Sequence, residues 1–296
     1  MLMDKLLVIL VTYNGERWLE RCLNSVLEST IRADLFVVDN GSTDASVGII
    51  GRMCPDAFLK ISHDNLGFGG ANNLGLQYAL DNGYDYVYLL NQDAWVEPDT
   101  FEKLICASRA YPEYGILSPL QVNESKTRLD RNFSRHYPCS LPPYPYSTVP
   151  PLIVVETRFA MAAHWLMTRR CIEITGLFSP TFFHYGEDSN YVQRLHFHGL
   201  KIGVVPSAIA VHDRETRPET TASRRRQFHS YGLIFLSNPN SRVRYARWAV
   251  HLLSTLFSSP RSFSFQSLKS TLMSLGSISG NREISRRAGA FIKSRQ

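Results

Sequence analysis

The 296-residue sequence has few cysteines and no long apolar run. Its five cysteines are odd in number and scattered, without a CxxC pair, which argues against a disulfide framework or a zinc site. No apolar stretch approaches the roughly 18–20 residues of a membrane span. With 44% hydrophobic residues the chain can still bury a substantial core. These features predict a globular cytoplasmic protein, with peripheral contact to the inner face of the cytoplasmic membrane as a further option.

Acidic residues are scarce at the end of the chain. Residues 214–296 hold fifteen Lys/Arg and only three Glu, although the net charge of the whole chain is only +6. This predicts an acidic body, 1–213, and a basic extension, 214–296. Within the extension, residues 242–257 place Trp and Leu at helical spacing behind several arginines. Such a helix suits an anionic membrane surface better than nucleic acid, but packing on the body or on a second copy of the chain fits equally well.

Short aliphatic runs alternate with helical patterns in the first part of the chain. Strands are expected at 5–11, 35–38, 58–62 and 86–90, and helices at 16–27 and 101–110. This alternation predicts an α/β fold with a largely parallel sheet and a first half that ends near residue 111. A further strand is expected at 199–206. The proline-rich segment 118–151 is expected to be irregular, as a flap near an acceptor site.

Polar side chains follow three of these strands directly. Tyr13 and Asn14 follow the first, Asp39 the second and Asp93 the fourth. Ligands of open α/β sheets bind beyond such strand ends. Asp39 can accept a hydrogen bond from a nucleotide base or ribose and Tyr13 can offer a ring face, although turn formation explains the same residues. Asp93 suits Mg²⁺ or Mn²⁺, or it caps the next helix.

Four other features are less specific. The segment beginning at Asn65 has glycines 67, 69 and 70 but does not read GxGxxG, and it follows the third strand, which argues against a dinucleotide-binding domain. Ser42 or Thr43 is expected to cap the helix after the second strand. Paired carboxylates 187 and 188 open another helix, where they could simply balance its dipole. His164, in an apolar run, is expected to be a core residue.

Four motifs in order carry a family resemblance. They are Val11-Thr-Tyr-Asn14, Val38-Asp-Asn-Gly-Ser-Thr-Asp44, the segment 65–75, and Leu90-Asn-Gln-Asp93. The sequence resembles family 2 glycosyltransferases, most closely their rhamnosyltransferase-like bacterial branch. The resemblance implies a GT-A fold, with a mixed, mostly parallel central sheet flanked by helices. It also implies a nucleotide-sugar donor, Mg²⁺ or Mn²⁺, and inversion at the anomeric carbon.

The resemblance assigns roles to individual residues. Asp188 would be the general base with Glu187 on the acceptor side, and Asp93 and His212 would hold the metal, a role favoured for His212 over that of a surface residue. The family often has Asp where this chain has Asn91, so Asp93 is the one anionic ligand in that motif. The donor-binding residues would be Thr12, Tyr13, Asn14, Asp39, Asn65, Gly67, Asn72, Asn91 and Gln92.

The sequence thus predicts transfer of a sugar to a growing cell-surface polysaccharide or lipid-linked glycan. Rhamnose from dTDP-rhamnose is the preferred donor and a UDP-hexose the next. Two other classes remain open. A sugar nucleotidyltransferase would usually have a basic glycine-rich loop after the first strand. This chain instead has Thr-Tyr-Asn-Gly-Glu at residues 12–16. A non-catalytic carbohydrate-binding protein would not need both Asp93 and Asp188. A nucleic-acid partner is not expected, and the extension could support a homo-oligomer.

Overall fold

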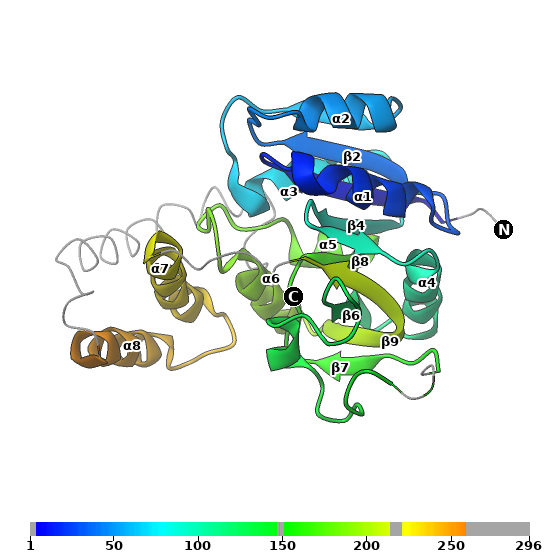
Figure 1. Ribbon diagram of the computed structural model, residues 1–296. Coiled ribbons are helices and arrows are strands. Elements are labelled where there is room, and N and C mark those ends of the chain that lie inside the picture. The colour runs from blue at the N-terminus through cyan, green and yellow to red at the C-terminus, as the bar shows by residue number, and fades with distance from the viewer. Residues whose placement is uncertain (1–3, 147, 149–150, 214–220, 259–296) are drawn as a thin grey trace. The chain divides into compact units, whose positions relative to one another are not determined.

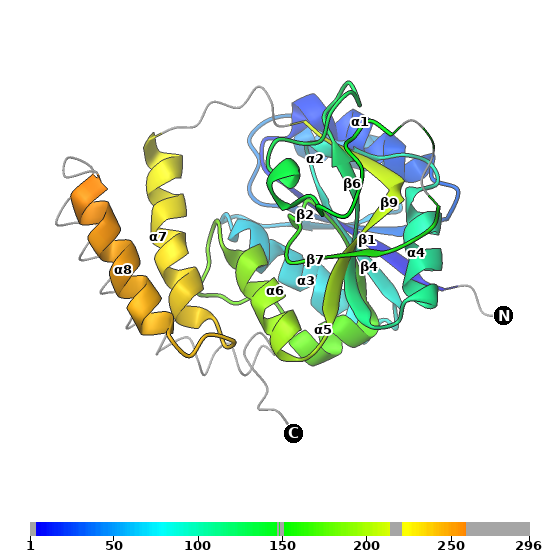
Figure 2. The ribbon, with the colours of Figure 1, turned by 90° about the horizontal axis from the view of Figure 1, so that it is seen from below.

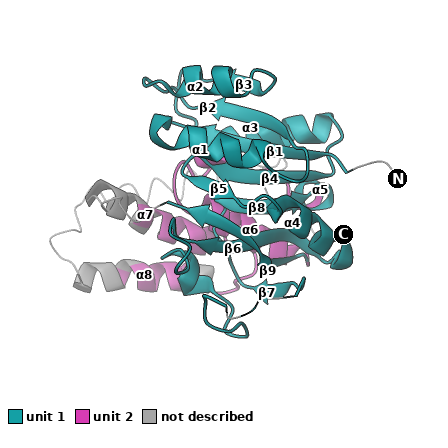
Figure 3. Cartoon of the chain, turned by 45° about the vertical axis from the view of Figure 1, so that its right-hand side comes forward, with its two compact units in different colours: residues 1–67, 71–173, 200–217 teal, residues 68–70, 174–199, 218–296 magenta. Residues whose placement is uncertain are grey.

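The computed structural model describes residues 4–146, 148, 151–213 and 221–258. The chain forms two compact units (Figure 3). The sheet unit comprises 1–67, 71–173 and 200–217, and the helical unit comprises 68–70, 174–199 and 218–296. The expected division after residue 213 stays a prediction. Residues 214–220 and 259–296 of the expected extension lie outside the described residues.

The sheet unit contains one mixed sheet in the order β3-β2-β1-β4-β8-β6-β9-β5, with β7 paired to β9 (Figure 1). Parallel pairing joins β3, β2, β1 and β4, and also β6 and β9, whereas β8, β5 and β7 pair antiparallel. The predicted mixed, mostly parallel sheet is therefore confirmed. The strands are β1 (Leu6–Thr12), β2 (Asp34–Asp39), β3 (Phe58–Ile61), β4 (Tyr86–Asn91), β5 (Ala94–Val96), β6 (Tyr114–Val122), β7 (Val155–Thr157), β8 (His164–Thr168) and β9 (Lys201–His212).

Helices cover both faces of this sheet (Figure 2). Leu6, Val8 and Leu10 of β1 share a core cluster with buried residues of α1 (Glu16–Leu27), α2 (Ser46–Met53) and α4 (Thr100–Ala110). Side chains alternate along a strand, so Ile9 points to the other face, where it meets α3 (Gly67–Asp81). A Cβ on Gly75 of α3 would lie 2.6 Å from Cδ1 of Ile9, so the helix approaches the strand closely because it has glycine there. α5 (Arg169–Thr175) follows β8.

The expectation that residues 118–151 are irregular was wrong at its beginning. β6 runs through Val122, is buried along its whole length and lies between β8 and β9. It contains Pro119, a residue that cannot donate to a strand ladder. The register with β9 shifts between Pro119 and Leu120, so the missing N–H falls at an irregularity in the ladder. Later in the segment, Phe133–His136 forms a 3₁₀ helix.

The helical unit contains α6 (Glu187–Phe197), α7 (Thr221–Ser237) and α8 (Arg244–Ser258). The helices predicted at Glu187 and across 242–257 are confirmed, and α7 was not predicted. α6 contacts α7, and α7 contacts α8. Among the described residues, no helix is long and apolar enough to cross a membrane.

Candidate functional site

The carboxyl ends of β1, β2 and β4 meet at one edge of the sheet. β1 pairs in parallel with both neighbours, and its last residues lie opposite theirs: Thr12 opposite Asp39, and Val11 opposite Asn91. The polar residues after the three strands therefore emerge side by side. The sheet unit thus has the strand-end arrangement that the sequence predicted for ligand binding.

Side-chain hydrogen bonds tie the loops after these strands together. Gln92 Oε1 accepts from the Thr12 hydroxyl at 2.7 Å and from the Tyr13 N–H at 2.8 Å, and its Nε2 donates to the Tyr13 carbonyl at 3.2 Å. Asn14 has a left-handed φ of 49° and accepts from the Thr43 N–H at 2.8 Å. A Cβ at Gly15 would lie 2.5 Å from Gln92 Oε1, so a larger residue there would displace the Gln92 side chain from these hydrogen bonds. Three of the predicted donor residues thus shape the loop that presents Tyr13.

Two groups at this edge remain available to a ligand. The Tyr13 side chain is 49% exposed. Asp39 is buried; its Oδ2 accepts from the N–H groups of Gly41 and Ser42 at 3.2 and 3.0 Å. Its Oδ1 is also buried but has no hydrogen-bond partner among the described residues. Asp39 therefore closes a turn with one oxygen and leaves the other as an unsatisfied acceptor, which is unfavourable until a donor arrives.

The helix after β2 begins later than expected. α2 starts at Ser46, so Ser42 and Thr43 do not cap it, and that expectation was wrong. Ser42 Oγ instead accepts from the Asn14 N–H at 2.9 Å. Asp44 Oδ1 accepts from the N–H of Ser46 at 3.0 Å. The polar run after β2 therefore links two loops rather than forming a simple cap.

The glycines after β3 belong to a helix rather than to a loop. Gly67 opens α3 with a φ of 71°, and its N–H donates to Asn65 Oδ1 at 2.9 Å. Asn40, beyond the end of β2, accepts from the Leu66 N–H at 3.3 Å. Asn72 is buried within α3. Asn65 therefore holds the start of α3, where the N–H groups of the first turn favour anions.

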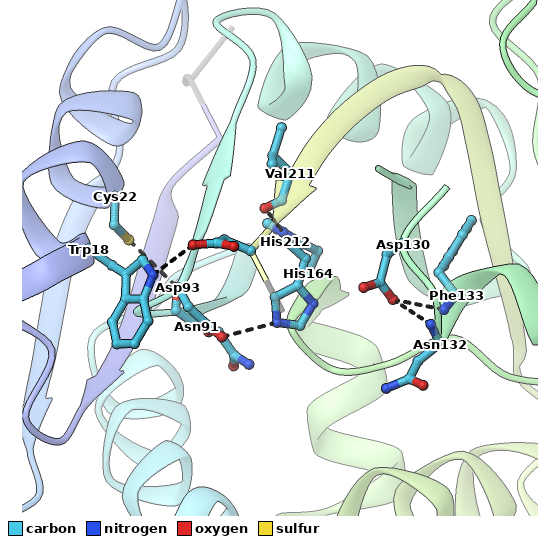
Figure 4. A network of polar contacts seen from close by, with 11 residues as sticks. Trp18, Cys22, Asn91, Asp93, Asp130, Asn132, Phe133, His164, Val211 and His212 are labelled. Atoms are coloured by element: carbon cyan, nitrogen blue, oxygen red, sulfur yellow. Dashed lines mark hydrogen bonds and ion pairs between the residues drawn. The ribbon is translucent and has the colours of Figure 1, made fainter. Parts of the chain in front are cut away.

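Asp93 lies in the two-residue turn between β4 and β5. Its expected alternative role as a helix cap is wrong, because β5 follows the turn and α4 begins only at Thr100. The carboxylate is 2% exposed, and its Oδ2 lies 3.6 Å from Nε2 of His212 (Figure 4). His212 ends β9 opposite Ala94 and is fully buried, so its reading as a surface residue is also wrong.

Cys22 of α1 contacts the Asp93 turn from the helix side. Its Sγ lies 3.6 Å from the Asn91 carbonyl oxygen, to which the thiol donates. Burial, and after it the charge of Asp93, raises the pKa of this thiol far above its ordinary value. Cys22 therefore stays protonated and is inert as a nucleophile. Asn91, which replaces an acidic residue of the family motif, contributes its backbone to this contact.

Sequence reasoning missed Trp18 and Asp213. Trp18 Nε1 donates to Asp213 Oδ2 at 2.9 Å, and the Asp213 N–H donates to the Asp93 carbonyl at 2.9 Å. These bonds fasten the end of β9 to α1 and to the Asp93 turn. Asp213 could have been suspected because it directly follows His212. Its contact with Trp18 could not be predicted, because 195 residues separate the two.

His164 is the core residue that the sequence predicted. It is fully buried in β8, with Nε2 at 3.0 Å from the Val211 carbonyl and Nδ1 at 2.8 Å from the Tyr88 hydroxyl. A carbonyl only accepts, so Nε2 carries the hydrogen and Nδ1 accepts from Tyr88. Burial raises the pKa of Tyr88 well above its ordinary value, which keeps this donor protonated. The pair thus orders the backbone next to His212.

The acidic pair lies in the helical unit, at the start of α6. Gly186 precedes the helix with a φ of 94°, and a Cβ there would lie 3.0 Å from the Phe182 ring. Glu187 is 6% exposed, and its Oε2 has no hydrogen-bond partner among the described residues. Burial, and after it the charge of Asp188, raises the pKa of Glu187 to about 8. Asp188 is partly exposed.

A buried arginine supports this helix start. Arg194 donates to the Thr175 and Leu177 carbonyls at 2.6 and 2.7 Å and to Asn190 Oδ1 at 3.1 Å. It thereby ties α6 to the chain that leads toward Glu187 and Asp188. The expected approach of Asp93 and Asp188 to one sugar carbon stays a prediction, because the two carboxylates belong to different units.

The side chains of Asp93 and His212 suit a divalent metal ion that takes few ligands from the protein. No cluster of three or more His, Cys, Asp or Glu with metal-binding geometry occurs within the described part of the chain. Asp93 and His212 supply one oxygen and one nitrogen. Mg²⁺-type sites commonly use one or two protein ligands and complete their shell with substrate phosphates and water. The residues present therefore fit a metal that arrives with a diphosphate.

Comparison with known proteins places the chain in a family. The family model described as glycosyl transferase family 2 matches residues 7–174. An N-acetylglucosaminyl-diphospho-decaprenol L-rhamnosyltransferase of Mycobacterium tuberculosis is 27% identical over 80% of this chain and 86% of its own length. Glycosyltransferase GlyA of Streptococcus pneumoniae is 36% identical over 34% of this chain. The match covers only 14% of the length of GlyA, and the match to a second glycosyltransferase covers 37% of that protein.

Solved structures agree with this placement. A mannosyltransferase of Pyrobaculum calidifontis, in complex with GDP-Man and Mn²⁺, superposes with a TM-score of 0.58 at 18% identity. The match covers 94% of this chain and 76% of that protein. At this identity the likeness shows the fold, which is of the GT-A type. The order of its strands and the family match over more than half its length lead to one conclusion: the chain belongs to glycosyl transferase family 2.

Proposed function

We propose that this glycosyltransferase moves a sugar, with inversion, from a nucleotide-sugar donor to a hydroxyl of a growing cell-surface polysaccharide or lipid-linked glycan. The observation that carries the proposal is the shared edge of β1, β2 and β4, where Tyr13, Asp39 and Asp93 lie at the carboxyl ends of adjacent parallel strands. The rhamnosyltransferase relative, matched over most of both chains, supports rhamnose as the sugar, and dTDP-rhamnose is the preferred donor. A UDP-hexose is the next choice.

The nucleotide would bind at the end of β1 and β2. The exposed ring of Tyr13 offers a stacking face for the base, and the buried Oδ1 of Asp39 offers an acceptor for a base N–H or a ribose hydroxyl. Thr12, Asn14 and Gln92 would act by holding the Tyr13 loop in place. The start of α3, held by Asn65 with Gly67 as its first residue, would line the pocket, with Asn72 one turn further along.

Asp93 and His212 would hold a divalent metal, Mg²⁺ or Mn²⁺. When bound, the ion would neutralise charge on the diphosphate as it departs. The buried polar contacts around these two residues keep them in place: Trp18 with Asp213 on one side, and His164 on the other. Such outer contacts orient ligands and limit which geometries they adopt. Asn91 leaves Asp93 as the one carboxylate of its motif, so the affinity for the metal depends strongly on this residue.

The chemistry would be a single displacement with Asp188 as the base. Asp188 takes the proton of the acceptor hydroxyl while the oxygen attacks the anomeric carbon, and the nucleoside diphosphate leaves from the opposite face. One attack from the rear inverts the configuration. A positioned base of this kind accelerates proton transfer by about 10²–10⁴. Glu187, next to it on α6, would lie on the acceptor side.

A donor-hydrolysis screen tests the proposal. The purified chain is incubated with Mn²⁺ and each of several nucleotide sugars, and release of the nucleoside diphosphate is measured. We expect dTDP-rhamnose to be turned over fastest and the Asp93→Ala variant to be inactive with every donor. Release of pyrophosphate from a sugar phosphate and a nucleoside triphosphate would point to a nucleotidyltransferase instead. A protein that binds glycans but hydrolyses no donor, even with an acceptor mixture present, would contradict catalysis.

A further inference from the structure

α8 packs on its neighbour α7 through the side of the helix that bears Trp248 and His251. The His251 ring lies 6.3 Å from the Tyr231 ring and 5.7 Å from the Phe235 ring of α7. A Cβ on Gly232 of α7 would lie 3.5 Å from Trp248. Trp248 and His251 are three residues apart and so share one side of α8. That side is therefore the one that faces α7, the helix that lies beside α8 in Figures 1 and 2.

The other side of α8 exposes apolar side chains. Ala246, Val250 and Leu253 recur at spacings of four and three, which places them away from Trp248 and His251. Val250 is 64% exposed and Leu253 52%, and Tyr245 on the flank is 59% exposed. An amphipathic helix of a globular protein normally turns its apolar stripe toward the core. Val250 and Leu253 lie away from α7 and stay exposed among the described residues, and an exposed apolar face of this kind indicates a binding surface.

The charged residues in this stretch of the sequence are all basic. Arg242 and Arg247 are exposed beside it. The sequence has no Asp or Glu from residue 220 to residue 282. Nucleic acid would match these arginines but would leave Val250 and Leu253 in water. A lipid surface with anionic head groups accommodates both features, because apolar residues enter its acyl boundary while arginines remain among the head groups.

We propose that the exposed face of α8, formed by Tyr245, Ala246, Val250 and Leu253 with Arg242 and Arg247, docks on an anionic membrane surface. The helix lies along the interface rather than across the bilayer. This inference goes beyond sugar transfer and does not depend on which donor is used. It gives the enzyme a location at which a lipid-linked acceptor would be concentrated.

Vesicle flotation of the full chain tests this proposal. We expect the protein to float with vesicles of phosphatidylcholine and phosphatidylglycerol at low salt, to float poorly with phosphatidylcholine alone, and to be released by high salt. Val250→Ser with Leu253→Ser should lower the partition coefficient roughly tenfold, and Arg242→Gln with Arg247→Gln by a similar factor. Leu27→Ser is the matched control, since Leu27 is 58% exposed on α1, and it should float like the unmodified chain.

Two outcomes would overturn the proposal. One is a chain that stays in the soluble fraction with every vesicle. The other is a dimer, seen by sedimentation, that dissociates in the variant with Val250→Ser and Leu253→Ser while flotation is unchanged. That result would make the face a contact between two copies of the chain. Circular dichroism checks that the serine variant is folded, and the exposed arginine variant provides a separate test. Donor hydrolysis in the absence of vesicles should be unchanged in both, so loss of flotation is distinguishable from loss of transferase activity.

Discussion

The substitution Glu187→Gln should remove a pH dependence from the stability of the protein. Glu187 is 6% exposed, and its pKa is raised from 4.5 to about 8, first by burial and then by Asp188. The folded state therefore binds this proton more tightly than the unfolded state does. The resulting stability is fully present below about pH 4.5 and is lost as the pH rises through 8. Glutamine has nearly the same shape as the protonated acid but has no proton to lose.

The size of the effect follows from the same shift. A pKa that moves from 4.5 to about 8 corresponds to a contribution on the order of 5 kcal/mol over the whole range. Between pH 6 and pH 8 the folded wild-type protein should lose about 2–3 kcal/mol through this group alone. Relative to wild type, Glu187→Gln should therefore become more stable as the pH rises across this interval.

Urea unfolding at pH 6, 7 and 8, followed by circular dichroism, measures this difference. Glu28→Gln is the control, because Glu28 is exposed at the end of α1 and its replacement should leave the pH dependence as in wild type. If wild type and Glu187→Gln lose stability in parallel between pH 6 and 8, Glu187 is charged in the folded protein. Burial at the start of α6 would then not control its proton, and the reasoning fails.

Three further predictions concern the site and the sheet. Asp188→Asn should lower transfer by about 10²–10⁴ while donor binding, measured by calorimetry, is unchanged; equal loss of both would mean that the role is misassigned. Asp93→Asn should raise the Mn²⁺ concentration needed for half-maximal activity by more than roughly tenfold, and an unchanged Mn²⁺ titration would remove Asp93 from the metal site. Gly75→Ala should destabilise the protein by roughly 1–3 kcal/mol, because its Cβ would lie 2.6 Å from Ile9. The matched change Gly48→Ala, which meets open space on α2, should stabilise it by roughly 0.5–1 kcal/mol, as compared by thermal unfolding.

Local patterns were enough to predict the first half of the fold. The helix expected at 16–27 is α1, and the four expected strands are β1 to β4 within a residue or two of their bounds. Each of these elements has a hydrophobic period of its own, so neighbouring residues alone define it. The strand ends could be placed together because parallel strands in one sheet bring their carboxyl ends to the same edge.

Features that depend on distant partners could not be predicted. Pro119 argued against a strand, yet a register shift against β9 accommodates it. The burial of His212 follows from pairing with β5, and the contact of Trp18 with Asp213 joins residues 195 positions apart. α7 was missed because its apolar residues gather at 231–236 rather than recurring along the helix. In each case the deciding interaction lies outside the local sequence window.

The hydrogen-bonded loops at the ends of β1, β2 and β4 have a consequence for engineering this enzyme. Gln92, Asn14 and Ser42 each bond to a loop other than their own, so the three loops hold one another in place. Replacing any of these side chains would disturb all three loops at once and would lower stability rather than alter selectivity. A change of nucleotide preference should therefore be sought at side chains that take no part in these hydrogen bonds, of which the exposed ring of Tyr13 is the clearest.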